Sequence, residues 1–348
     1  LLFLFTIDEE TGLTGAGGLA EGLVRGRRLI NLDSVEERVL TIGCAGGADS
    51  HLHLSVERKA VPGDSTAVSI RLSGLKGGHS GVDIHLQRGN AVKILARALH
   101  AAALVEPIRV VDFAGGNAHN AIPREADATV VVPAAADIAQ RVRDIIETEL
   151  TDVASELRTP DPGMAFEVAT ESAPDEALTE NDSRKLLALV SALPHGVMAM
   201  SSDIDGLVET STNCAVVRED DGQAFVLMSS RSSVMSSLSA LRQRIGAIAY
   251  LSGADLHEKD GYPAWQPDVD SALLKVVKEV HERIAGEAEI GAVHAGLECG
   301  IVGEKYPGMD MISFGPQIDF PHSPDERVKV ASVAEFYDAL KAVLAELA

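Results

Sequence analysis

The chain has 348 residues, 46% of them hydrophobic, and its 52 acidic residues outnumber 30 basic ones to give a net charge of −22. This charge argues against nucleic acid or an anionic membrane as a partner, because both would repel the chain. The length favours two domains. The three cysteines, Cys44, Cys214 and Cys299, form neither a disulfide framework nor a paired-cysteine zinc site, which indicates a reducing compartment such as the cytoplasm.

An apolar run over residues 1–7 opens the chain and leads into three acids, Asp8, Glu9 and Glu10. The run is too short to span a membrane and lacks the basic flank of a signal peptide, so it predicts a buried strand. Because the chain starts inside this predicted strand, we expect a segment before it. The acids lead into a glycine-rich turn at residues 15–18.

A second apolar run, residues 29–33, also ends in an acid, Asp33. Open α/β sheets bind ligands at the carboxyl ends of their strands, so Glu9, Glu10 and Asp33 would meet at one edge. Neighbouring carboxylates repel one another unless a cation compensates, and a metal ion is the usual one. The alternative interpretation is a solvated acidic turn.

Two further strands are predicted early in the chain, at residues 39–44 and 51–56. His51 and His53 would share one face of the second strand, which is a possible zinc pair. No third ligand is near them in the sequence, so a surface position is the favoured interpretation.

Between Asp64 and Glu258 the predicted elements follow a strand–helix–strand–strand rhythm that appears roughly twice, which suggests a two-sheet or doubled α+β unit. The predicted strands are residues 68–72, 109–113, 126–132, 210–217 and 224–230. The predicted helices are residues 87–103, 136–157, a short one capped by Asp182 or Ser183 and ending at Pro194, and 233–252.

The end of the chain returns to an α/β pattern after a rigid link at residues 262–268. A helix at 271–284, capped by Asp270, a strand at 309–314 and a helix at 333–347 are predicted there. We therefore predict two domains. Residues 1–60 and 259–348 form one α/β domain, and residues 61–258 form a second domain inserted into it.

Six short motifs follow one another along the chain. They are Thr6-Ile-Asp-Glu-Glu10, Asn31-Leu-Asp-Ser34, Lys76-Gly-Gly-His-Ser-Gly81, Asn120-Ala-Ile-Pro123, His294-Ala-Gly-Leu-Glu-Cys-Gly300 and Pro321-His-Ser-Pro-Asp-Glu326. In this order they resemble the aminoacyl-histidine dipeptidase (peptidase D) branch of the dinuclear zinc peptidases, a family that also includes carnosine dipeptidases, aminoacylases and glutamate carboxypeptidases. The resemblance implies a zinc-exopeptidase-like three-layer catalytic domain with an inserted α+β lid and dimerisation domain.

The resemblance also implies a role for each acid of the first motifs. Glu9 is similar to the general base that takes a proton from the metal-bound water. Glu10 and His322 resemble ligands of one zinc, and Asp33 resembles a ligand of the other. Manganese and cobalt accept the same ligands, so the native metal stays open.

The remaining motifs supply residues that resemble substrate-binding groups. His79 is similar to a lid histidine that reaches across a dimer to steady the oxyanion, which implies a homodimer. Asn120 and Arg231 resemble groups that bind the substrate's carboxylate. Glu298 resembles a group that holds the substrate's amino end. For Arg231 the alternative is neutralisation of an acid in the lid.

Two other side chains near these motifs have open or structural interpretations. His294 is either a residue that supports the site or a packed core histidine. Cys299 is interpreted as a small packed residue, since the motif places no base beside it.

The family pattern includes an H-x-D pair and a metal-bridging Asp upstream of the Glu-Glu turn, and neither is found in this sequence. A catalytic zinc normally takes about three protein ligands, so we expect the chain to be incomplete at its N-terminus. The predicted function is a cytoplasmic metal-dependent dipeptidase that cleaves Xaa-His dipeptides such as β-alanyl-histidine. An N-acyl-amino-acid amidohydrolase and an inactive peptide-binding or dimerising remnant are the alternatives.

Overall fold

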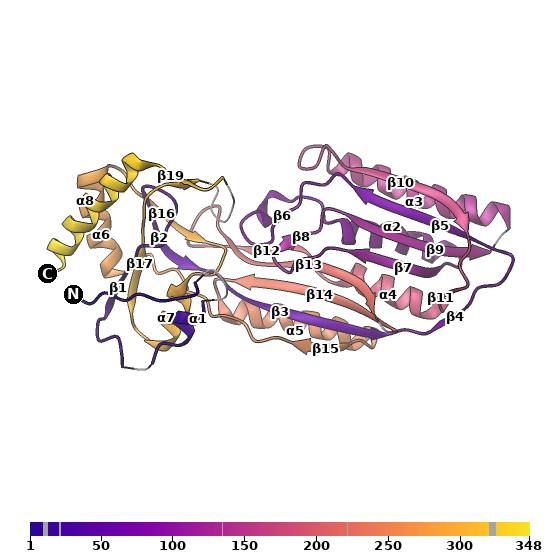
Figure 1. Cartoon of the computed structure of the whole chain (residues 1–348), viewed down its shortest axis with the longest axis horizontal. Coiled ribbons are helices and arrows are strands. Elements are labelled where there is room, and N and C mark those ends of the chain that lie inside the picture. The colour runs from indigo at the N-terminus through magenta and orange to yellow at the C-terminus, as the bar shows by residue number, and fades with distance from the viewer. Residues whose placement is uncertain (10–12, 21, 134, 221, 320–324) are drawn as a thin grey trace.

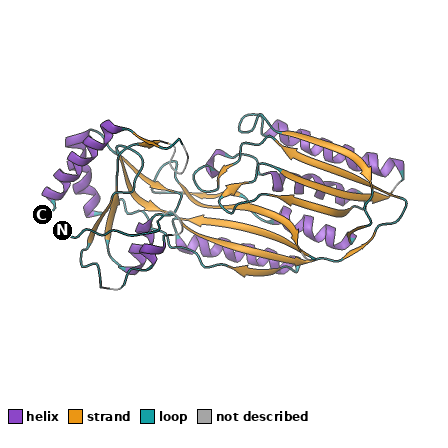
Figure 2. Cartoon of the chain, viewed as in Figure 1, coloured by secondary structure: helices purple, strands orange, loops and turns teal. Residues whose placement is uncertain are grey.

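The computed structural model describes residues 1–9, 13–20, 22–133, 135–220, 222–319 and 325–348 (Figure 1). These residues form an elongated molecule with a small sheet and both termini at one end and a large sheet at the other (Figures 1 and 2). None of the described helices combines the length and apolar composition needed to cross a membrane.

The small sheet has the strand order β1-β17-β2-β16, with the outer pairs parallel and the central pair antiparallel. Its strands are β1 (Arg28–Asn31), β2 (Val39–Cys44), β16 (Glu289–Val293) and β17 (Asp310–Ser313). Its helices are α1 (Thr14–Gly17), α6 (Ala272–Ala285), α7 (Glu298–Lys305) and α8 (Val330–Glu346). Helices α6 and α8 pack on each other, α7 contacts β2 and α1, and a single core cluster joins α6, α8 and the sheet.

The large sheet has nine strands, and four helices pack on it. The strands are β3 (Gly46–Ser55), β5 (Ser65–Ser73), β7 (Arg109–Gly115), β9 (Ala126–Pro133), β10 (Ala165–Ser172), β12 (Gly196–Met200), β13 (Val208–Asp220), β14 (Gln223–Ser232) and β15 (Asp255–Glu258). The helices are α2 (Ala91–Val105), α3 (Ala136–Glu156), α4 (Glu180–Ala192) and α5 (Met235–Ser252).

Short elements complete the described chain. The strand pairs are β4 (Arg58–Ala60) with β11 (Glu176–Leu178), β6 (Gly78–His79) with β8 (Ala121–Ile122), and β18 (Ile318–Asp319) with β19 (Arg327–Val328); a 3-10 turn spans Ile84–Leu86.

The large sheet consists of two halves with the same topology. In one half β5, α2, β7, β9, α3 and β10 follow one another and give the strand order β10-β5-β9-β7. In the other half β3, α4, β13, β14, α5 and β15 give the order β15-β3-β14-β13. Each half is thus a β-α-β-β-α-β unit. The halves meet where Gly115 of β7 pairs with Val217 of β13, so the predicted doubling occurs within one continuous sheet.

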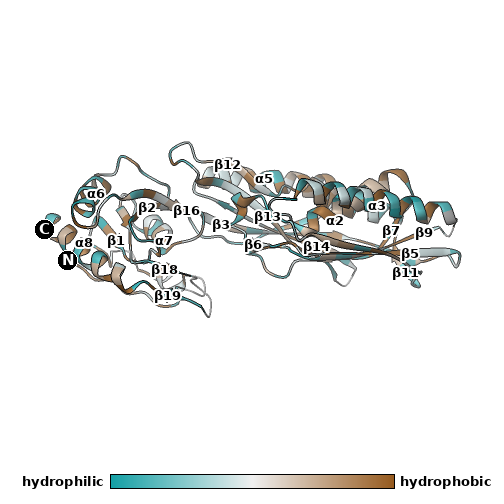
Figure 3. Ribbon diagram, turned by 90° about the horizontal axis from the view of Figure 1, so that it is seen from above, coloured by the Kyte–Doolittle hydropathy of each residue, from teal (hydrophilic) through white to brown (hydrophobic). Residues whose placement is uncertain are grey.

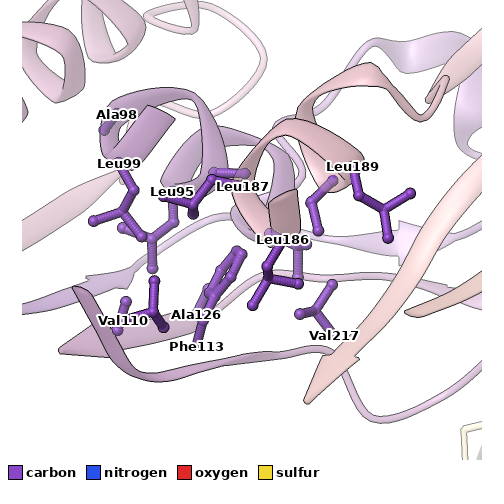
Figure 4. Close-up of a cluster of buried hydrophobic side chains, with 14 of the residues drawn as sticks. Leu95, Ala98, Leu99, Val110, Phe113, Ala126, Leu186, Leu187, Leu189 and Val217 are labelled. Carbon is purple, nitrogen blue, oxygen red and sulfur yellow. The ribbon is translucent and has the colours of Figure 1, made fainter. Parts of the chain in front are cut away.

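One apolar core runs between the large sheet and its helices, which lie along one face of it (Figure 3). Figure 4 shows the side chains of Leu95 and Leu99 of α2 and of Leu186 and Leu187 of α4 between these helices and strand β7, which carries Val110 and Phe113. The alternation of apolar residues along the strands supplies the other wall of this core. The mixed α/β class predicted from the sequence is confirmed.

The chain crosses between the two sheets twice, and the two crossings are paired. Cys44 and Trp265 exchange backbone hydrogen bonds of 2.8 and 3.0 Å, and Gly47 and Tyr262 exchange bonds of 3.1 and 2.9 Å. Strand β3 begins directly after the first crossing and lies in the large sheet, although it precedes residue 60.

Three local predictions are wrong. Helix α6 is capped by Ser271, whose hydroxyl accepts the Leu274 N–H at 3.0 Å, and not by Asp270. Residues 1–7 form no strand, and Leu1 and Phe5 are 90% and 89% exposed, because no described strand lies beside them to bury their side chains. Helix α4 is capped by Thr179, whose hydroxyl accepts the Asp182 N–H at 3.1 Å, and not by Asp182 or Ser183. Thr179 has the short oxygen-bearing side chain that an N-cap requires.

Candidate active site

A tight loop holds Glu9 at the start of the chain. Asp8 adopts φ 64° and accepts a 2.8 Å hydrogen bond from the Thr14 hydroxyl. The Gly15 N–H donates to the Ile7 carbonyl at 3.1 Å, and a β-carbon on Gly15 would lie only 2.2 Å from that oxygen. The loop therefore depends on a glycine at this close approach. Glu9 itself accepts the Leu13 N–H through its carbonyl and is half-buried.

Asp33 lies on the turn that follows β1, as predicted. The Asn31 side-chain oxygen accepts the Asp33 N–H at 2.9 Å and the Ser313 hydroxyl at 2.7 Å, which ties the turn to the end of β17. The chain after β17 continues alongside it, and the Ile318 N–H donates to the Val35 carbonyl at 2.8 Å. The segment that leads toward residue 322 thus lies beside the Asp33 turn.

Glu298, the first residue of α7, contacts the segment that precedes Glu9. Its Oε2 accepts the Thr6 hydroxyl at 2.9 Å, and its Oε1 is buried without a partner in the described part of the chain. Burial raises the pKa of the Cys299 thiol well above its usual value, and the nearby Cys44, Glu298 and Asp33 raise it further. Cys299 is therefore a protonated, packed thiol, and the Glu9 loop, Asp33 and Glu298 lie in one region.

Of the three predicted zinc ligands, the structure describes Asp33. Glu10 and His322 lie outside the described residues. Among the residues that the structure describes, no group of three His, Cys, Asp or Glu side chains is placed to hold a metal ion. The predicted donors, carboxylates with an imidazole, are nevertheless the ligand types that zinc accepts.

The His51 and His53 pair lies on β3 and is not part of this region. The register pairs His51 with His257 of β15, and the His53 and His257 rings are 5.2 Å apart. These histidines also contact Phe225. Among the described residues, these histidines belong to no group of three His, Cys, Asp or Glu side chains placed to hold a metal ion.

Arg231 is a buried cation where the two sheets meet. Its side chain lies on β14, is 6% exposed, and donates from Nη1 to the Tyr262 hydroxyl at 2.6 Å. Its Nε is buried without an acceptor, and Arg231 forms no ion pair with any acid among the described residues. The alternative that Arg231 neutralises a lid acid is therefore not supported by the described residues, and its charge is available for an anion.

His294 lies beside Arg231 and is 7% exposed. Its Nε2 shares a 2.7 Å hydrogen bond with the Ser211 hydroxyl of β13, and its Nδ1 is buried without a partner in the described chain. Burial, with smaller contributions from Arg231 and His79, lowers the pKa of His294 to about 3. His294 is therefore neutral at physiological pH and does not compete with Arg231 for an anion.

The imidazole of His79 has a defined tautomer. Its Nδ1 accepts the backbone N–H groups of Gly81 at 3.2 Å and Val82 at 3.0 Å. Because a backbone N–H can only donate, Nδ1 carries no proton, and the neutral ring holds its proton on Nε2. His79 can therefore act as a hydrogen-bond donor through Nε2.

His79 lies close to Arg231 and His294 within its own chain. A β-carbon on Gly81 would be 2.3 Å from the His294 carbonyl oxygen, 3.1 Å from His79 Cε1 and 3.2 Å from Arg231 Cδ. Only glycine fits where these three groups converge. Asn120 is exposed beside them, and its carbonyl accepts the Ser80 N–H at 2.8 Å.

Two members of this cluster were not among the residues that the sequence singled out for the site. Tyr262 was noted only as part of the link, and Ser211 not at all. The signal available for Tyr262 was an aromatic residue in a rigid proline-containing link. Their contacts bridge residues 31 and 83 positions apart, which no local pattern reveals.

The low pKa of His294 predicts a dependence of stability on pH. Between its ordinary value of 6.5 and about 3, the unfolded chain binds a proton at this residue that the folded chain does not. The free energy of unfolding should therefore fall on acidification below pH 6.5, by up to about 1.4 kcal/mol per pH unit from this residue. The free energy of unfolding can be measured with urea at pH values from 7.5 to 4.5. The slope of this free energy against pH should be smaller in His294→Gln, by the equivalent of nearly one bound proton. An unchanged slope, or an equal reduction in the exposed His85→Gln control, would contradict this assignment.

Comparisons with known proteins agree on one family. Residues 1–346 match the sequence profile of peptidase family M20/M25/M40. The chain is 38% identical over 345 residues to the cytosol non-specific dipeptidase of Escherichia coli (strain K12), covering 99% of this chain and 71% of that protein. The crystal structure of aminoacylhistidine dipeptidase from Vibrio alginolyticus superposes with a TM-score of 0.92 at 39% identity, covering 98% of this chain and 69% of that one.

Proposed function

The chain belongs to peptidase family M20/M25/M40, and on that premise we propose that it is a metal-dependent dipeptidase that removes a C-terminal histidine from Xaa-His dipeptides such as β-alanyl-histidine. The similar proteins from Escherichia coli and Vibrio alginolyticus are named as a dipeptidase and an aminoacylhistidine dipeptidase. The proposal extends that substrate class to this chain.

Arg231 is the single observation that carries the substrate assignment. A buried guanidinium with no acid partner in the described chain is costly unless a ligand supplies the anion. A dipeptide brings such an anion, its free carboxylate, and a planar guanidinium can bind it through two hydrogen bonds. Asn120, exposed near Arg231, is proposed as a second group for this carboxylate. An endopeptidase would have no use for such an anchor.

The acids at the other side of the site are proposed to carry the chemistry. Glu9 takes a proton from the attacking water and delivers it to the leaving amine. Glu10 and His322 would hold one metal ion and Asp33 the other. A bound metal pair polarises the scissile carbonyl and lowers the pKa of the attacking water to about 7. His79 donates from Nε2 to the developing oxyanion, and Glu298 holds the substrate's amino end.

The finer features of this enzyme are also proposals. The metal is zinc, two ions per subunit, with manganese or cobalt as substitutes. The lid comprises residues 61–258, and the position of β3 in the large sheet would extend it to include residues 46–60. The protein is cytoplasmic. A homodimer through the lid, with His79 acting across it, stays a prediction.

Metal removal tests this function on the protein expressed from its complete gene. Dialysis against a chelator should abolish hydrolysis of β-alanyl-histidine, and zinc should restore it to the starting rate, because the metal pair supplies the activated water. The released histidine is quantified by chromatography. Hydrolysis that persists after the metal is shown to be absent would exclude a metallopeptidase.

A further inference from the structure

Tyr262 contacts Arg231 at the junction of the two sheets and has no role in the function proposed above. The Arg231 Nη1 donates to the Tyr262 hydroxyl at 2.6 Å, and this is the hydrogen bond that orients the buried guanidinium. Because the other buried nitrogen, Nε, has no acceptor in the described chain, the direction of the guanidinium depends on the phenol. Tyr262 is therefore placed to fix the donor that would meet the substrate.

The ring of Tyr262 is held between two glycines from different parts of the fold. A β-carbon on Gly47 would lie 2.6 Å from the Tyr262 hydroxyl oxygen, and one on Gly296 would lie 2.8 Å from its Cε2. The Tyr262 backbone also exchanges two hydrogen bonds with Gly47. Gly47 is the register partner of Arg231 in the large sheet. This packing leaves the phenol one position, directly beside the guanidinium.

The phenol hydroxyl of Tyr262 can orient the Arg231 guanidinium without neutralising its charge. Burial raises the pKa of Tyr262 above its usual value of 10, although Arg231 opposes this effect. The hydroxyl is therefore neutral at physiological pH. An aspartate or glutamate in its place would neutralise Arg231 and compete with an incoming carboxylate, whereas a neutral acceptor orients the guanidinium and leaves its charge intact.

We propose that Tyr262 is a positioning residue for substrate recognition, which holds the Arg231 guanidinium in place for the free carboxylate of the substrate. The inference rests on the carboxylate role given to Arg231 in the proposed function. It adds that the link between the two domains, and not only the lid strand β14, determines the preference for a free C-terminus. The ring also contacts Gly296, in the loop that leads to Glu298, so the same residue joins the lid to the opposite side of the site.

The test measures binding, so that it does not depend on turnover. Calorimetric titration with L-histidine and with L-histidinamide, which lacks the carboxylate, gives the ratio of the two affinities. Loss of one hydrogen bond to a charged group changes an equilibrium by roughly tenfold. Tyr262→Phe should therefore lower the preference for the acid by about tenfold. It should have no such effect in an Arg231→Met background, because the two residues act as one unit.

The controls separate positioning from general damage. Tyr250→Phe changes a tyrosine that is 85% exposed on α5 and should leave the preference unchanged. Gly47→Ala keeps the hydroxyl but displaces the ring, and should lower the preference as Tyr262→Phe does. An unaltered preference in Tyr262→Phe, an equal loss in the Arg231→Met background, or no preference in the unmodified protein would overturn the inference. If the preference behaves as expected but β-alanyl-histidine is not hydrolysed, the proposed reaction fails and the carboxylate site stands.

Discussion

Glu9→Gln is expected to lower kcat for β-alanyl-histidine by about 10² to 10⁴-fold, the range that a lost general base gives. Glutamine keeps the shape of the side chain and cannot accept the proton of the attacking water. The Glu9 loop is held by the Asp8–Thr14 and Gly15–Ile7 hydrogen bonds, which this change does not touch. The KM should therefore change little, and steady-state kinetics on the purified variant measures both constants.

The matched control is Glu287→Gln, which removes a carboxylate at an exposed position outside the site. Its kcat should equal that of the unmodified protein. A Glu9→Gln variant with a normal metal content that retains more than about a tenth of the kcat would refute the role of Glu9 as base.

Arg231→Met is expected to raise KM and to lower kcat/KM by about a hundredfold, because two charge-assisted hydrogen bonds to the substrate carboxylate are lost. Methionine fills a similar volume without charge. Replacing a buried cation that has no acid partner in the described chain should leave the free energy of unfolding unchanged or raise it. Loss of activity together with undiminished stability would assign Arg231 to binding and not to the core.

Arg218→Met serves as the control, since Arg218 lies on the neighbouring strand β13 over the Phe225 ring, away from the junction. Its kcat/KM should stay within about twofold of the unmodified value. If Arg231→Met cleaves the dipeptide and its C-terminal amide with the same ratio of kcat/KM values as the unmodified protein, the carboxylate assignment is wrong.

Much of the fold could be predicted because its elements have strong periodic patterns. The predicted strand at 39–44 is β2, and the predicted helix at 136–157 is α3 to within one residue. Strand β10 was missed because it is an edge strand with few buried side chains, so its apolar alternation is weak. The run at 1–7 was assigned wrongly because an apolar pattern shows that a segment can be buried but not what would bury it.

The site, like the fold, has parts that the sequence predicts and parts that it does not. The motifs around Glu9, Asp33, His79 and Glu298 were sufficient to identify the peptidase family, which the 38% identical dipeptidase confirms. Ser211 and Tyr262, two members of the cluster around Arg231, could not be predicted, because they reach it from a distant strand and a distant link. Hydrogen bonds across such separations depend on the pairing of whole elements and leave no local trace in the sequence.

The most direct test of the account compares two substrates on the protein expressed from its complete gene and loaded with zinc. The measurement is kcat/KM for β-alanyl-histidine and for N-acetylhistidine, which share the carboxylate that Arg231 would bind but differ in the free amine. A dipeptidase that holds this amine at Glu298 should prefer the dipeptide by at least about tenfold, the effect of one charged hydrogen bond. An equal or greater rate with N-acetylhistidine would make the protein an amidohydrolase and contradict the account.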